Sequence, residues 1–153
     1  MSPEERIVEL GLRLPAVAAP LASYVPTVRT GSLVYTSGQL PIVEGELVET
    51  GLVGAEVTPE RAYELARICA LNAIAAVRAE VGELSRVVRI VKVVGFVASA
   101  AGFYGQPQVV NGTSELLGEV FGEAGVHARS AVGVAVLPRN APVEVELIAE
   151  VAQ

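Results

Sequence analysis

The 153-residue chain is 52% apolar, carries a net charge of −6 and has a mean hydropathy of +0.51. This composition excludes a disordered chain, and the length predicts a single domain spanning residues 1–153. No uncharged apolar run is long enough to cross a bilayer, and the first ten residues are acidic where a signal peptide would be basic. We therefore expect an intracellular, cytoplasmic protein.

The charged and aromatic residues argue against a nucleic-acid partner. Lys92 is the sole lysine, the arginines are scattered, and only seven residues are Phe or Tyr. A nucleic-acid interface would need a basic patch with aromatic side chains for stacking. The single cysteine excludes an internal disulfide and a cysteine-cluster metal site. With so few charges on a small chain, we expect another subunit to cover part of the apolar surface.

Residues 1–20 are expected to form a short helix followed by an extended arm. Ser2 is suited to cap the helix, Pro3 to occupy its first turn and Glu5 to return a hydrogen bond to the cap. Gly11 marks the end of the helix, and the prolines and small residues that follow favour an extended chain.

The next segments are a strand at about 33–37 and a turn at 44–46, after which a short strand or loop continues. A long helix is expected from Thr58 to about Val81, because threonine followed by proline is a start signal and Gly82 a stop signal. Its apolar residues recur at three- and four-residue spacing, so one face should be buried.

The strand predicted at 86–98 is apolar on both faces, which is typical of a central strand covered on both sides. Strict alternation would place one set on one face (Val88, Ile90, Lys92, Val94 and Phe96) and a second set on the other (Val87, Arg89, Val91, Val93 and Val97). A second helix is expected at 107–122. Two final strands follow at 127–137 and 143–151, joined by a turn at 138–142.

The predicted order is thus β-β-α-β-α-β-β, an α+β fold with a mixed sheet. Two helices would cover one face of this sheet. The other face is also apolar, and association of subunits through that face is the simplest way to bury it.

Most common site signatures are absent from the chain. There is no phosphate-binding glycine loop after a strand and no G-x-S-x-G, and His127 is the sole histidine, which excludes a two-histidine metal site. Cys69 lies on the apolar stripe of the long helix, where a core role is favoured. We therefore predict no metal site.

One charged residue stands out in the segment GVHARSAVGV. His127, Arg129, Ala131 and Gly133 share one face of a predicted strand, so small residues surround a single guanidinium. This arrangement leaves room for a ligand, and the guanidinium can bind a carboxylate through two hydrogen bonds. A salt bridge to an acidic residue of the fold or of a neighbour explains the arginine equally well. His127 has no evident carboxylate partner in the sequence and is a secondary candidate.

Two acidic residues, Glu144 and Glu146, alternate with apolar residues in the last strand. For Glu146, a solvated position is the favoured explanation. If residues 138–142 close a simple hairpin, Glu144 pairs near Ala135, and at about 3.3 Å per residue it lies roughly 20 Å from Arg129 within one chain. The two residues could then share a site only across a subunit interface.

Two segments, SYVPTVRTGSLVYTSGQLP at 23–41 and ARSAVGVAVLPRNAPVEVELIAEV at 128–151, resemble the RidA/YjgF family, also called the L-PSP endoribonuclease family. Residues 1–15 are similar to the extension of a subgroup with slightly longer chains. The resemblance implies a chorismate-mutase-like α+β subunit assembled as a homotrimer with clefts between subunits. It also implies hydrolysis of reactive enamines and imines, derived from amino acids, to 2-oxo acids and ammonia without a cofactor.

The same resemblance implies roles for individual residues. Arg129 would hold the substrate carboxylate, and Glu144 would position water. The substrate-binding positions implied in the same way are Tyr24, Ser37, Gly38, Asn111 and Ala131. Judged without the resemblance, Tyr24 would be an interface-packing residue and Asn111 a residue that bonds within its helix.

The chain departs from the family pattern at three places. Ala131 stands where many members have a cysteine, Gly133 where an acidic residue is frequent, and Ala22-Ser23 where a glycine-proline precedes the tyrosine. We expect a roomier and less polar cleft as a result.

The resemblance and the residues together suggest three functions. An enamine or imine deaminase leads, because the arginine of the motif is retained. A non-catalytic protein that binds small carboxylates is the second. A ribonuclease is the third, and the acidic charge argues against it.

Overall fold

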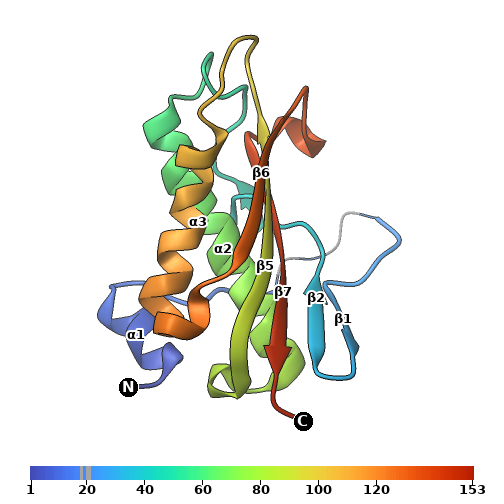
Figure 1. The fold of residues 1–153 in the computed structure, drawn as a ribbon. Coiled ribbons are helices and arrows are strands. Elements are labelled where there is room, and N and C mark those ends of the chain that lie inside the picture. The colour runs from blue at the N-terminus through green and yellow to red at the C-terminus, as the bar shows by residue number, and fades with distance from the viewer. Residues whose placement is uncertain (18, 20–21) are drawn as a thin grey trace.

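In the computed structural model, which describes residues 1–17, 19 and 22–153, five strands form one mixed sheet (Figure 1). Their order across the sheet is β1-β2-β7-β5-β6, and only β5 and β6 run parallel. The strand bounds are Thr27–Thr30 (β1), Leu33–Thr36 (β2), Val87–Ala98 (β5), Ala128–Val134 (β6) and Val143–Val151 (β7). The predicted α+β class and mixed sheet are confirmed.

The element order is also confirmed, with one change near the start. The first strand of the leading pair is β1, which the sequence did not predict. Residues 46–54, where a short strand was an option, contribute only β4 (Glu46–Leu47), which pairs with β3 (Ile42–Val43). The described residues of the predicted arm form neither helix nor strand, and positions 18, 20 and 21 lie outside the described residues.

The N-terminal helix α1 (Pro3–Glu9) has the predicted cap. The Glu5 backbone N–H donates to Ser2 Oγ at 3.1 Å, and the Ser2 N–H donates to Glu5 Oε2 at 2.7 Å. The reciprocal pair satisfies two N–H groups that would otherwise lack partners. Ile7 is buried and packs into the core on the inner side of the helix.

Both long helices cover the same face of the sheet. They are α2 (Pro59–Val81) and α3 (Gln106–Phe121), and they lie side by side over the sheet (Figure 1). The core cluster of the described residues contains side chains of both helices and of the strands. Thr58 caps α2, and Gly82 ends it with a φ of 91°. The two helices approach closely at Gly112, where a Cβ would overlap the Tyr63 carbonyl oxygen. The absence of a side chain at Gly112 permits this approach.

The predicted faces of the central strand β5 are wrong in its first half. Its register against β7 shifts between Val87 and Arg89 and again between Ile90 and Lys92. These bulges break the alternation, so that Ile90 and Val93, three residues apart, are both buried in the core. From Val93 onward the alternation is regular.

The expected hairpin of the last two strands does not form. β5 lies between them, with Gly95 opposite Ala131 on one side and opposite Val145 on the other. The reason is that β6 follows β5 through α3, a crossover that places it parallel to β5 at the edge of the sheet. The residues after β6 must then pass the end of β5 to reach β7.

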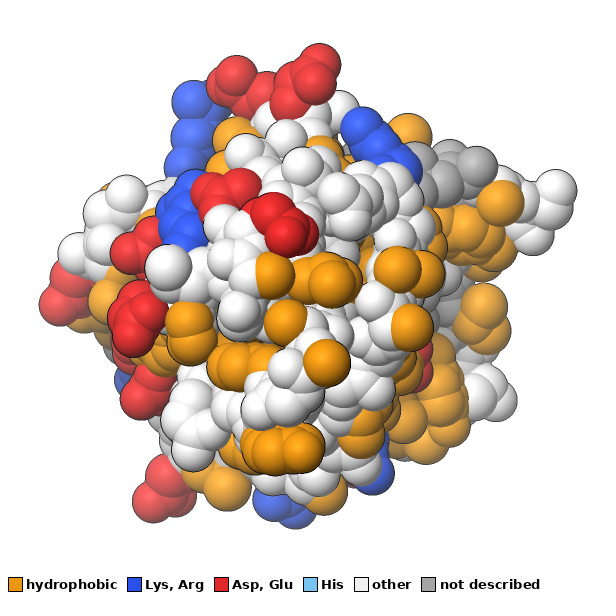
Figure 2. Space-filling view, turned by 90° about the horizontal axis from the view of Figure 1, so that it is seen from above, with side chains coloured by type: hydrophobic (Ala, Val, Ile, Leu, Met, Phe, Trp, Pro, Cys, Tyr) orange, Lys and Arg blue, Asp and Glu red, His pale blue; other side chains and the backbone are white. Residues whose placement is uncertain are grey.

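The face of the sheet away from the helices is uncovered in the described chain and carries several apolar side chains beside the charged Glu144, Glu146 and Lys92. Exposed side chains there include Val28, Tyr35 and Val132, with exposed fractions of 57%, 40% and 43%. Seen from above, basic side chains lie at separate points, those on the upper left beside acidic ones, and form no continuous patch on the visible face (Figure 2). Burial of this sheet face by another subunit stays a prediction.

Candidate functional site

Arg129 lies on β6 and points toward α3. Its Nη1 donates to Asn111 Oδ1 at 2.8 Å and to Ser114 Oγ at 3.2 Å, and its Nη2 donates to the Pro107 carbonyl oxygen at 3.3 Å. All three acceptors are neutral and belong to α3. Asn111, the second-helix residue singled out by the resemblance, is therefore in direct contact with Arg129.

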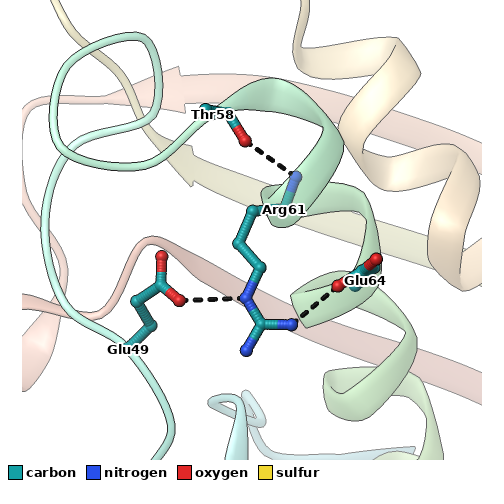
Figure 3. Close-up of polar contacts among 4 residues, drawn as sticks. All are labelled: Glu49, Thr58, Arg61 and Glu64. Carbon is teal, nitrogen blue, oxygen red and sulfur yellow. Dashed lines mark hydrogen bonds and ion pairs between the residues drawn. The ribbon is translucent and has the colours of Figure 1, made fainter.

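The charge of Arg129 has no acidic partner among the described residues. Arg61 provides the contrast, because it bonds to Glu49 at 2.9 Å and to Glu64 at 2.7 Å at the start of α2 (Figure 3). The ion pairs of residues 1–17, 19 and 22–153 involve only Arg61 and Arg67 as cations. A salt bridge within the chain, one of the two explanations of Arg129, is thus excluded for the described residues.

The guanidinium of Arg129 keeps donors available. It has five N–H groups, and the three bonds to α3 can use three of them. Nε makes no hydrogen bond with the described part of the chain. A half-exposed guanidinium fixed by neutral oxygens, with donors to spare, is suited to bind a carboxylate.

Polar side chains occupy the space beside Gly133. A Cβ at Gly133 would lie 2.8 Å from Gln106 Nε2 and 3.1 Å from Ser99 Oγ. The Gln106 amide is itself held, donating to Ser99 Oγ at 3.1 Å and to the Phe103 carbonyl at 2.8 Å. A glutamine amide therefore takes up the space beside Gly133 within the chain, and the roomier, less polar cleft between subunits stays a prediction.

A second group of predicted site residues gathers around the start of β7. Glu144 packs against Gly38 so closely that a Cβ there would overlap the carboxylate. The neighbouring Ser37 donates from Oγ to the Val25 carbonyl at 2.6 Å, which fixes the segment containing Tyr24 beside it. The Tyr24 side chain is 44% exposed. The structure therefore brings four of the predicted residues into one region.

Burial of Glu144 affects its proton affinity. Partial desolvation raises the pKa of the Glu144 carboxyl above its ordinary value, and the nearby charge of Glu146 raises it further. A carboxylate with a raised pKa is a better proton acceptor, which is what activation of water requires.

The two groups lie on opposite faces of the sheet. Arg129 is opposite Val93, which points into the core beneath the helices. Glu144 is opposite Phe96, which in turn is opposite the exposed Val132 on the other face. The predicted hairpin distance is wrong because the hairpin is absent, but Arg129 and Glu144 still cannot meet within one chain.

Sequence reasoning missed Ser114 and underrated His127. The His127 Nε2 lies 2.8 Å from Ser114 Oγ, and its Nδ1 lies 2.6 Å from the Gly125 carbonyl oxygen. Asn111 and Ser114 are three residues apart on a helix, a spacing that places both on one face. That spacing was the available signal, but only the tertiary structure shows that this face meets Arg129.

Other kinds of site find little support in the described chain. Among residues 1–17, 19 and 22–153, no three His, Cys, Asp or Glu side chains converge to hold a metal ion, and no helix has the length and apolar character to cross a membrane. Cys69 is buried, and desolvation raises its thiol pKa well above the ordinary value. The core role predicted for it is confirmed.

Comparisons with known proteins agree with this architecture. The family model described as "YjgF/chorismate mutase-like, putative endoribonuclease" matches residues 4–151. Protein TCP17 of Trypanosoma cruzi is 46% identical over 142 residues, which cover 92% of this chain and 89% of that protein.

Two solved structures are also similar. A "putative endoribonuclease" from Shewanella oneidensis MR-1 is 40% identical, with a TM-score of 0.96 over 99% of this chain and 100% of that one. Escherichia coli TdcF, solved with bound serine, is 28% identical, with a TM-score of 0.64 over 92% of this chain and 96% of that one. Because the family model and these relatives span nearly the whole sequence, the chain belongs to the YjgF/chorismate-mutase-like family.

Proposed function

We propose that this protein hydrolyses small enamine or imine intermediates derived from amino acids to 2-oxo acids and ammonia. The reaction would take place in clefts between the subunits of a homotrimer. The observation that carries the proposal is Arg129, a guanidinium fixed by three neutral oxygens. It has donors to spare and no carboxylate partner in the part of the chain that the structure describes.

The proposed substrate class follows from this arginine. A 2-aminoacrylate-like molecule carries a carboxylate next to the carbon that bears nitrogen, so binding of the carboxylate orients the reacting carbon. The serine bound to Escherichia coli TdcF is an amino acid of similar size with the same carboxylate. This likeness supports a small amino-acid-derived ligand for the present chain.

The chemistry needs one water molecule and no redox step. The enamine first takes a proton at its terminal carbon to become an iminium, whose carbon is electrophilic. Water attacks that carbon while the Glu144 carboxylate of a neighbouring subunit accepts a water proton. The nitrogen of the resulting carbinolamine takes up the proton that Glu144 holds, which returns Glu144 to its ionised form. The carbon–nitrogen bond then breaks as the hydroxyl releases its proton to solvent, and a 2-oxo acid and ammonia leave.

The direct test measures the reaction with a freshly generated substrate. A pyridoxal-phosphate lyase acting on serine supplies 2-aminoacrylate, and pyruvate formation is followed with and without the purified protein. We expect the wild type to accelerate pyruvate formation and Arg129→Ala to lower kcat/KM roughly 100-fold or more, about 2.7 kcal/mol of transition-state stabilisation. Arg13→Ala, at an exposed arginine outside both groups, is the matched control and should behave as the wild type.

The proposal would be contradicted if the wild type did not accelerate pyruvate formation, or if Arg129→Ala accelerated it as well as the wild type.

A second candidate is a protein that binds small carboxylates without turnover, which the serine-bound relative favours. Tight binding of a 2-oxo acid with no effect on pyruvate formation would support it. Cleavage of RNA by the wild type, lost in Arg129→Ala, would instead favour the ribonuclease.

A further inference from the structure

We propose that Ser114 and His127 are positioning residues for Arg129, which hold its guanidinium in the orientation that a ligand carboxylate requires. This inference rests on the proposed function only in taking Arg129 as the carboxylate-binding group. His127 has no carboxylate partner among the described residues, and the proposal gives a role to a pair of polar side chains beside the site.

The hydrogen bonds of the pair have a defined direction. A carbonyl oxygen can only accept, so the bond to Gly125 places the proton of the neutral imidazole on Nδ1. Nε2 is then an acceptor, and the Ser114 hydroxyl donates to it. The lone pairs of Ser114 Oγ consequently remain free to accept from Arg129 Nη1.

The result is a chain of donors and acceptors in one sense. Arg129 donates to Ser114, Ser114 donates to His127, and His127 donates to the Gly125 carbonyl. Bonds aligned in this way polarise and strengthen one another. Without His127 the Ser114 hydroxyl could rotate and donate to other acceptors. The bond from Arg129 Nη1 to Ser114 Oγ would then lose its fixed direction.

The far end of this series of hydrogen bonds packs closely against α3. A Cβ at Gly125 would overlap the Leu117 carbonyl oxygen, so the backbone of Gly125 lies directly against α3. Its carbonyl is thereby held in place relative to the helix that also carries Asn111, Ser114 and Pro107. Arg129 is accordingly fixed from one helix by three contacts, of which the Ser114 contact depends on His127.

Ligand binding measures the positioning directly. Pyruvate, the 2-oxo acid expected as product, serves as the probe in isothermal titration calorimetry. We expect Ser114→Ala and His127→Phe each to weaken pyruvate binding about tenfold, since each removes the directed bond to Nη1. His127→Gln keeps an oxygen acceptor for the Ser114 hydroxyl and should recover most of the affinity. Thermal unfolding of each variant checks that the fold is intact.

A double-mutant cycle separates positioning from other effects. In an Arg129→Lys background there is no planar guanidinium to orient, so Ser114→Ala should weaken pyruvate binding less than about threefold further. An undiminished effect of Ser114→Ala in that background would overturn the inference, because the pair would then act other than through Arg129.

The remaining outcomes separate this inference from the proposed function. Suppose that the wild type binds pyruvate and that Arg129→Ala abolishes this binding. If Ser114→Ala and His127→Phe then bind pyruvate as tightly as the wild type does, the inference fails and the carboxylate role of Arg129 stands. If Arg129→Ala binds pyruvate as well as the wild type, or the wild type binds none, the carboxylate role fails and the inference with it.

Discussion

Arg129 and Glu144 project from opposite faces of one sheet, although only the central strand β5 separates the strands that carry them. Each face of the subunit therefore holds one part of the predicted site. A closed symmetric oligomer repeats both faces, so that Arg129 of one subunit can lie beside Glu144 of the next. The fold of a single chain thus makes the predicted assembly a condition of the proposed chemistry.

The contact between Gly38 and Glu144 leads to the first prediction. In Gly38→Ala the new methyl group must displace the Glu144 carboxylate, which is the mobile end of a long side chain. We expect deaminase kcat/KM to fall about tenfold or more, equal to about 1.4 kcal/mol, while the free energy of unfolding changes by no more than about 1 kcal/mol.

The double variant Gly38→Ala/Glu144→Gln is the control for this prediction. If Gly38→Ala acts by moving the carboxylate, it should have little further effect once that carboxylate is gone. Losses that add fully in the double variant would show that Gly38 acts in some other way.

Packing of the two long helices gives the second prediction. Gly112→Ala would place a methyl group on the Tyr63 backbone carbonyl, and backbone atoms cannot move aside as a side-chain end can. We expect a loss of about 1–3 kcal/mol in the free energy of unfolding, measured by urea denaturation. Gly118→Ala in the same helix meets no atom within 4 Å and should stabilise the protein by up to about 1 kcal/mol. Equal effects at both positions would contradict this account.

Local signals in the sequence were sufficient to predict the helices. The start signals at Ser2 and Thr58 and the stop at Gly82 depend on residues a few positions apart, and the structure confirms each of them. A local pattern failed where a distant segment intervened. The turn at 138–142 favours a hairpin of β6 and β7, but β5 lies between these two strands in the sheet.

For the candidate site, too, local patterns in the sequence identified a residue but not its distant partners. Arg129 stood out because a charged residue among small residues in a strand needs a partner. The sequence of that one strand is enough to show this need. Its actual partners, Asn111 and Ser114, lie on α3, and only the crossover from β5 to β6 brings that helix over Arg129. Likewise, the bulges of β5 leave no mark in its run of valines and were not predictable from alternation.

The raised pKa of Glu144 leads to the third prediction, which concerns stability and pH. The folded state holds the Glu144 proton to a higher pH than the unfolded chain does, because burial and the Glu146 charge disfavour the ionised form. Stability should therefore fall as the pH rises from about 4.5, the ordinary glutamate value, through the raised value. Glu144→Gln cannot ionise, so its free energy of unfolding relative to the wild type should rise across that window.

Urea denaturation at a series of pH values and a fixed protein concentration measures this difference. Glu146→Gln removes only the like charge, the lesser of the two causes, and should reproduce part of the effect. A wild-type curve parallel to that of Glu144→Gln over the whole range would mean that the pKa of Glu144 is not raised by folding.

The opposite placement of Arg129 and Glu144 leads to the fourth prediction, on mixed oligomers. Arg129→Ala and Glu144→Gln chains should each be inactive alone, because every cleft lacks one group. When the two chains are unfolded together and refolded at equal amounts, random assembly should give about a quarter of the clefts an intact Arg129 from one chain and an intact Glu144 from the other. Deaminase activity should return to about a quarter of the wild-type value. Chains refolded separately and then combined without exchange are the control and should stay inactive. A site contained within one chain could not be complemented in this way, so a mixture as inactive as its components would refute a shared cleft.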